Sequence, residues 1–277
     1  MRKLFVSADM EGCGAVSSQH ALTPDRWEWG AARRWMTAEV LAVSEAAFAA
    51  GYDEVIVADS HGNAHNIDPD ALPDNVRLVR SWPRPLFTMQ GVEDPCVDSC
   101  ALVGYHAGSL QTGGLLAHSF SGAACREVRL NGVTCTEGYL SAACAGAFGH
   151  PVVFVSGDQR TIEDSRRYAP DAVGFISKQA LGWRAQSSLP PSQVRRGLKE
   201  SAAAAFRKAR PEPFTLEPPL RLEMEMTSQV AAELLSYLPG IERVGACGIA
   251  GTFAHVEAIM RFVGFAILYS PTGSVAL

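Results

Sequence analysis

Carboxylate and imidazole side chains follow the ends of three apolar, strand-like runs in this sequence. They are Asp9, Glu11, His61 and His106. In an extended backbone, residues two apart point to the same side, so Asp9 and Glu11 converge while Met10 points away. Two carboxylates and two imidazoles form a mixed oxygen and nitrogen set that suits Zn²⁺, with Mn²⁺ or Co²⁺ as alternatives on the same ligand chemistry. The pattern therefore predicts a metal centre.

Two further residues are candidates for the same centre. A carboxylate at a strand end can bridge two ions, and ions about 3.5–4 Å apart share one activated water. Glu137, at the start of a predicted helix, is the best-placed fifth ligand. His118 lies in a Gly- and Ser-rich loop, from which it can act as a base or a nucleophile rather than as a ligand. The residues alone indicate hydrolysis and leave phosphoester and amide substrates both open.

Each of these residues has an ordinary structural role when it is considered alone. Asp9 after a strand is more often a turn or cap residue than a ligand. Glu137 in isolation is a favourable charge at a helix N-terminus. The joint placement of the carboxylates and imidazoles is what favours a metal centre. Lys178 does not belong to this cluster and is interpreted as a surface residue rather than a substrate-binding cation.

The elements that must position these residues alternate between strands and helices. Strands are predicted at 4–8, 54–58, 101–105 and 151–155, and helices at 31–50, 137–148 and 161–168. Asn131-Gly132 between two apolar runs predicts a hairpin turn. The alternation predicts an α/β fold with a mainly parallel sheet flanked by helices. Ligands bind at the carboxyl ends of strands in such sheets, so we expect the predicted metal ligands to meet there.

The sequence pattern changes after Lys178. Pro190-Pro191 precedes an Ala-rich helix, a Pro-rich connection covers 211–219, and an alternating strand at 220–226 precedes two more helical patterns. We therefore predict a metal-binding catalytic α/β region at 1–185 and a C-terminal α+β region at 186–277. The second region is expected to belong to the same catalytic unit and to an oligomer interface.

Composition excludes several classes of partner. The 277 residues carry a net charge of −5, so no basic face for nucleic acid is expected. We find no apolar run of the roughly 18 residues that a membrane span needs, and the short apolar run after Lys3 is not a signal peptide. The seven cysteines are scattered without a C-x-x-C pair, which favours a reducing compartment and a cytoplasmic location.

Five segments occur in an order that resembles the zinc-dependent bacterial D-aminopeptidase family (DppA-like). They are SADMEG (7–12), ADSHGN (58–63), GYHAG (104–108), AHS (117–119) and TEGYLSA (136–142). The resemblance implies two Zn²⁺ per chain, with Asp9 as the bridging ligand and His118 as the catalytic residue. The other implied ligands are Glu11, His61, His106 and Glu137. It also implies a homo-oligomer, a decameric ring in that family.

The resemblance favours one activity over two alternatives. The expected function is that of a dinuclear zinc aminopeptidase that hydrolyses the N-terminal D-amino acid from short peptides. A two-metal phosphoesterase would need Arg or Lys near the site for phosphate, and none lies within the ligand motifs. A non-enzymatic peptide-binding module linked to transport would not need a dinuclear centre. An assay that compares hydrolysis of D-alanyl peptides with hydrolysis of a phosphomonoester separates these alternatives.

Overall fold

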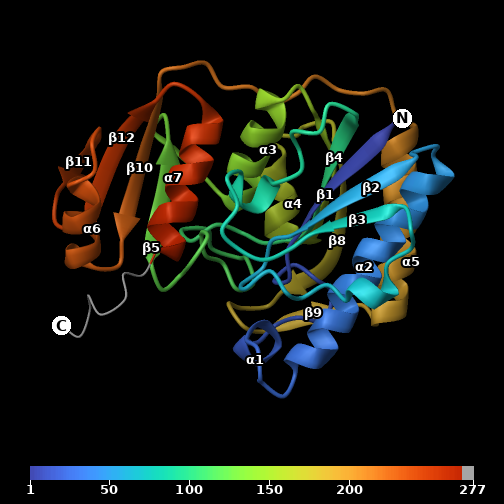
Figure 1. The fold of residues 1–277 in the computed structure, drawn as a ribbon. Helices are drawn as coiled ribbons and strands as arrows, with labels where there is room; N and C mark the ends of the chain where they lie inside the picture. Colours follow the sequence, from blue (N-terminus) through green and yellow to red (C-terminus); the bar gives the residue numbers. More distant parts are fainter. Residues whose placement is uncertain (270–277) are drawn as a thin grey trace.

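The structure, a computed structural model, describes residues 1–269 as two sheets with helices around them (Figure 1). Sheet A has seven strands in the order β3 (Val76–Val79), β2 (Glu54–Asp59), β1 (Lys3–Ala8), β4 (Val97–Tyr105), β7 (Val152–Asp158), β8 (Val173–Ala180) and β9 (Gln186–Ser188). Neighbouring strands pair in parallel except β9, which is antiparallel to β8. The predicted α/β fold with a mainly parallel sheet is confirmed.

Helices cover both faces of sheet A, which explains why its central strands read as continuous apolar runs. Every residue of β1 is buried. Leu4 and Val6 pack in one cluster with residues of α2 (Trp29–Ala49) and α5 (Pro191–Arg207). Phe5 packs on the opposite side, in a cluster with α3 (Glu137–Ala147) and α7 (Val256–Leu268). A strand buried on both faces needs apolar side chains at consecutive positions rather than at alternate ones.

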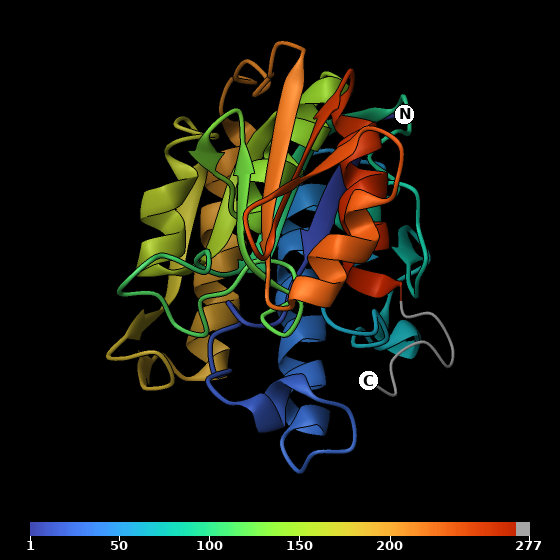
Figure 2. The same cartoon turned by 90° about the vertical axis from the view of Figure 1, so that its left-hand side faces the viewer.

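Sheet B is antiparallel and lies on the α3 and α7 side of the molecule. Its order is β11 (Ile241–Val244), β12 (Gly248–Phe253), β10 (Leu220–Met226), β5 (Cys125–Leu130) and β6 (Val133–Thr134). Figure 2 views the molecule from this side, with β10 near the centre and α6 (Gln229–Ser236) beside it. The predicted hairpin turn is confirmed, because Asn131 and Gly132 both have positive φ, 52° and 77°.

The two predicted regions exchange segments across residue 185. From the first region, β5 pairs with β10 of the second. From the second region, β9 joins sheet A, and α5 packs on α2 in the core of sheet A. The division into 1–185 and 186–277 stays a prediction.

The sequence patterns did not indicate several elements. They are β3, β8, β9, β11, β12, α1 (Gln19–Leu22) and two 3₁₀ turns, η1 (Pro69–Ala71) and η2 (Phe87–Met89). The predicted helix at 161–168 begins two residues earlier, as α4 (Gln159–Ser165). None of the helices described is long and apolar enough to cross a membrane.

Candidate metal centre

The predicted ligands come from neighbouring strands that end at one edge of sheet A. Strand β1 lies between β2 and β4 and is parallel to both. Asp9 follows the last residue of β1, His61 lies two residues beyond β2, and His106 directly follows β4. Glu137 is the first residue of α3, whose N-cap is Thr136. The carboxyl edge of the sheet therefore receives donors from three strands and one helix N-terminus.

Glycines allow the segment after β1 to fold back against β4. The backbone N–H of Gly12 donates to the carbonyl of Gly104 at 2.7 Å. A Cβ atom at Gly12 would lie only 2.0 Å from the carbonyl oxygen of Tyr105, so no larger residue fits there. Gly104 itself has φ +70°, a conformation that favours glycine. This close approach brings the carboxylates of the DMEG segment toward His106.

Two groups of three possible ligands lie at this edge. Within each group, one donor atom per residue lies within 4.8 Å of the others; the groups are Asp9, Glu11 and His61, and His106, His118 and Glu137. Asp9 belongs spatially to both. Its Oδ1 lies 3.4 Å from His61 Nδ1, and its Oδ2 lies 3.3 Å from His106 Nε2. The structure therefore brings together all six residues that the sequence singled out, with Asp9 between the two groups.

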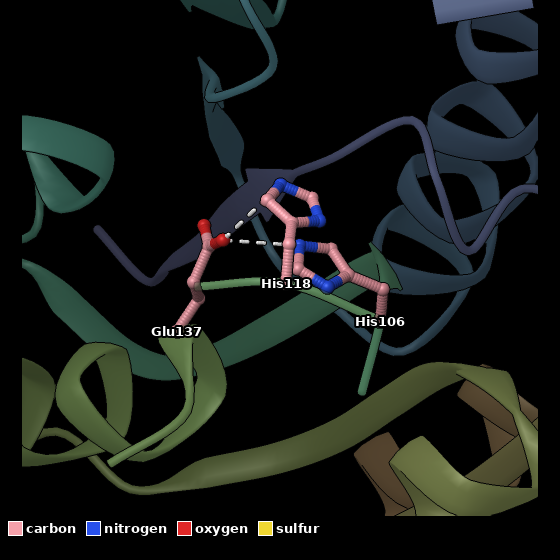
Figure 3. A group of neighbouring side chains, drawn as sticks. All are labelled: His106, His118 and Glu137. Carbon is pink, nitrogen blue, oxygen red and sulfur yellow. Dashed lines mark ion pairs between the residues drawn. The ribbon is translucent and has the colours of Figure 1, made fainter. Parts of the chain in front are cut away.

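The second group is compact and centres on Glu137 (Figure 3). Glu137 Oε1 lies 3.0 Å from His106 Nε2 and 3.8 Å from His118 Nε2. The two imidazole rings are stacked, with centroids 4.1 Å apart and planes 6° apart. Glu137 Oε1 also accepts a hydrogen bond from the backbone N–H of Phe120 at 2.6 Å. This bond ties the loop that carries His118 to the start of α3.

Backbone carbonyls orient all three imidazoles. In each ring, one nitrogen donates to a carbonyl, so that the other nitrogen faces the carboxylates. The acceptors are the carbonyls of Leu22 for His61, Ala107 for His106 and Leu116 for His118, each at 2.9 Å. Metal-bound histidines commonly donate their second N–H in this way, which sets the tautomer and the ring orientation.

The donor atoms at this edge of the sheet are arranged as metal binding requires. His106 Nε2 is buried and makes no hydrogen bond with any of the described residues, although two carboxylate oxygens lie within 3.3 Å of it. A neutral imidazole would point a lone pair at those oxygens, an arrangement that a shared cation stabilises. Donors that share one tetrahedral Zn²⁺ at about 2.0–2.2 Å lie roughly 3.3 Å apart. The observed spacings of 2.9 to 3.4 Å agree with this value.

The electrostatics of the centre also favour cations. Burial and the neighbouring Glu11 carboxylate together raise the pKa of Asp9 to about 7. Burial alone would lower the pKa of His106, but the carboxylates of Glu137, Asp9 and Glu11 together outweigh it, and the pKa rises to about 10. Three buried carboxylates thus concentrate negative charge in this small volume, and positive charge of any kind is stabilised there.

The loop that carries His118 is held at several backbone positions. Asp158, the N-cap of α4, accepts from the backbone N–H of Leu115 at 2.6 Å. The carbonyl of Trp183 accepts from Leu116 N at 2.8 Å, and the Trp183 indole donates to the Ala117 carbonyl at 3.2 Å. Leu116, whose carbonyl orients His118, has φ +53°. Asp158 therefore caps α4 and also anchors this loop.

Lys178 is not at the surface as predicted, because its side chain is only 2% exposed. Its ammonium donates to the carbonyls of Glu11, Cys13 and Val16, the last two at 2.8 and 2.5 Å. Burial lowers the pKa of Lys178 to about 8. The side chain therefore fastens the segment that presents Asp9 and Glu11. In the sequence, Lys178 stands between the polar residues Ser177 and Gln179, so the local pattern does not indicate burial.

Replacement of Lys178 by methionine should weaken metal binding. The variant leaves three buried carbonyls without their donor, at about 1–3 kcal/mol for each unsatisfied group, and frees the carboxylate segment to move. We expect zinc affinity to fall by about 10–100-fold, as for other residues that orient ligands. Zinc titration followed by a metal-sensitive dye measures this. Lys199→Met, which removes an exposed ion pair with Glu45, is the control. Equal affinities in both variants would contradict the fastening role.

The two groups lie at a pocket of about 730 Å³, a size typical of small-ligand sites. Glu11, His61 and His118 line it together with apolar and small residues, and sequence reasoning missed two of its members, Arg126 and Trp183. A carboxylate and imidazole centre at the carboxyl edge of a parallel sheet, open to such a pocket, defines a metal-dependent hydrolase of the α/β class.

Comparison with known proteins identifies the family. The sequence profile of the D-aminopeptidase family, peptidase family M55, matches residues 1–265. A D-aminopeptidase of Bacillus subtilis (strain 168) is 29% identical over 243 residues, which cover 87% of each chain. A solved structure, described as Zn-dependent D-aminopeptidase DppA from Bacillus subtilis, a self-compartmentalizing protease, superposes with a TM-score of 0.90. It is 26% identical, and the match covers 97% of this chain and 99% of that one. The chain belongs to the D-aminopeptidase family, which confirms the predicted resemblance and the class of enzyme.

Proposed function

We propose that this chain is a dinuclear zinc aminopeptidase that removes the N-terminal D-amino acid from short peptides. The proposed ligands are Asp9, Glu11, His61, His106 and Glu137. The observation that carries the proposal is the position of Asp9, whose two carboxylate oxygens face the two different ligand groups. The zinc-dependent structural relative supports the choice of metal, as does the mixed oxygen and nitrogen donor set.

The ions contribute one part of the chemistry and the chain another. When bound, two zinc ions supply Lewis acidity that lowers the pKa of water and polarises the scissile carbonyl. The carboxylates hold the centre in place from the ends of β1 and the start of α3. The centre also suits the free α-amine of a peptide, because a neutral amine nitrogen is a donor that zinc accepts.

His118 is the residue for proton transfer or attack. Its Nδ1 donates to the Leu116 carbonyl, so its Nε2 presents a lone pair 3.8 Å from both Glu11 and Glu137. The side chain is 23% exposed and lines the pocket, so a substrate can reach it. A general base would use this lone pair to accept a proton from water, and a nucleophile would use it to attack the carbonyl carbon. Both roles require the tautomer that the Leu116 carbonyl selects.

Zinc analysis together with paired peptides tests the proposed function. We expect two zinc ions per purified chain, and faster hydrolysis of D-alanyl than of L-alanyl dipeptides, with no cleavage of a phosphomonoester. The phosphatase assay is included because Arg126 lines the pocket, although no Arg or Lys lies within the ligand motifs. Zinc-dependent phosphatase activity without peptide hydrolysis would favour the phosphoesterase instead. Binding of peptides without turnover or zinc would favour a binding module.

We also propose that the chain assembles into a closed homo-oligomer in the cytoplasm. The description of the structural relative as self-compartmentalizing supports assembly, and the decameric ring is the form that the family resemblance implies. The seven free cysteines are compatible with a reducing compartment. Light scattering of the purified protein should give a mass of ten chains, and a monomeric mass would contradict this proposal.

A further inference from the structure

Arg126 is a cationic side chain on the wall of the pocket that the metal centre shares. Among the described residues that line this pocket, it is the one Arg or Lys, and His118 and Glu11 line the same space. The side chain is exposed. Within residues 1–269 it makes no hydrogen bond or ion pair, whereas Arg129 on the same strand is paired with Glu127. A guanidinium without a partner in a substrate pocket is free to bind an anion.

A β-bulge directs Arg126 away from the core. In the pairing of β5 with β10, Glu127 faces Glu225 but Cys125 faces Met226, so Arg126 is an extra residue without a partner in the register. Without the bulge, the two-residue alternation of the strand would place position 126 on the same buried face as Val128. Cys125 is buried instead, and Arg126 is exposed. Bulges next to active sites commonly change the direction of one side chain in this way.

The pocket offers partners for both ends of a short peptide. The proposed metal centre suits the free amine at one end, and much of the remaining wall is apolar, including Leu22, Leu116 and Trp183. Arg126 supplies the complementary charge for the other end of the substrate. Guanidinium groups bind carboxylates through two parallel hydrogen bonds, which adds orientation to charge attraction.

We propose that Arg126 binds the C-terminal carboxylate of the peptide and so selects short substrates with a free C-terminus. This inference rests on the proposed peptidase function. An extended peptide spans about 3.3–3.6 Å per residue, so a residue in the same pocket as His118 can meet the C-terminus only of a peptide a few residues long. In longer chains and in peptide amides, Arg126 faces no carboxylate and contributes no selectivity.

Matched acid and amide substrates test this inference. D-Alanyl-glycine and its C-terminal amide, with the corresponding tripeptide pair, are assayed with the wild type and with Arg126→Gln. The effect is read on whichever free acid, dipeptide or tripeptide, the wild type cleaves with the higher kcat/KM. For that substrate, kcat/KM should fall by about 10–100-fold in the variant, mainly through KM, as for loss of a charge-assisted contact. The amides should be unaffected, and zinc content unchanged. Arg207→Gln, at the exposed end of α5, is the control.

The results separate the inference from the proposed function. Two results would overturn the role of Arg126 and leave the peptidase function intact. The first is a wild type that cleaves acids and amides equally well, and the second is an Arg126→Gln variant that loses activity on both to the same extent. Absence of hydrolysis in the wild type would overturn the peptidase function instead. In that case, calorimetric Kd values for the acid and amide dipeptides still decide whether Arg126 binds the carboxylate: an acid preference that disappears in Arg126→Gln supports it, and no preference contradicts it.

Discussion

His118→Ala should lose most turnover while it keeps both zinc ions. Removal of a proton-transfer group typically lowers a rate by about 10²–10⁴-fold, and we expect a decrease of that size in kcat on a D-alanyl dipeptide. The zinc content should stay at two per chain, because the five proposed ligands remain in place. Steady-state kinetics and elemental analysis on the same preparation measure the two quantities together.

The zinc content decides between two roles of His118. The imidazole stacks on His106 and shares Glu137 with it, so its position alone also suits a ligand. Loss of one ion in His118→Ala would make it a ligand, and full activity would remove it from the mechanism. His65→Ala is the matched control, because His65 is exposed, interacts with Arg80 and lies outside the pocket lining. It should retain both activity and zinc.

The central part of the fold could be predicted because burial on both faces leaves a strong local signal. Strands β1, β2 and β7 are buried at every residue, and their apolar runs are visible without any knowledge of their partners. Parallel strands end at one edge, so the residues that follow them converge. Asp9 and His106 were predictable for this reason, because each directly follows a strand. Edge strands such as β3 and β11 are only partly buried and give no comparable pattern.

The residues that support the centre could not be predicted because they depend on contacts between distant segments. Lys178 meets the carbonyl of Glu11 across 167 positions of the chain. The direction of Arg126 depends on a bulge opposite Met226, one hundred positions away. No local pattern specifies either contact. The carbonyl of Leu22, which orients His61, belongs to α1, and a four-residue helix leaves little periodicity in the sequence.

Asp9→Asn should remove both zinc ions and all measurable activity. The substitution keeps the shape of the side chain, and its amide oxygen can still accept from Met10 N, which donates to Asp9 Oδ1 at 2.8 Å. It loses the negative charge that faces both ligand groups. We expect zinc affinity to fall by more than the roughly 10–100-fold seen when a residue that hydrogen-bonds to a metal ligand is replaced. Thermal unfolding should report this independently, since a ligand at 100 times its Kd stabilises a protein by about 2.7 kcal/mol.

The comparison with Glu11→Gln separates a bridging role of Asp9 from a general loss of charge. Both variants remove one buried carboxylate charge from the same segment, but Glu11 belongs to the group with His61, whereas the oxygens of Asp9 face both groups. We therefore expect Glu11→Gln to retain one zinc ion, in the group of His106 and Glu137, and Asp9→Asn to retain none. One ion in both variants would mean that Asp9 serves a single site, and two ions in Asp9→Asn would mean that it is not a ligand. The stoichiometry, rather than the activity, thus decides whether one carboxylate joins the two sites, because either loss is expected to stop turnover.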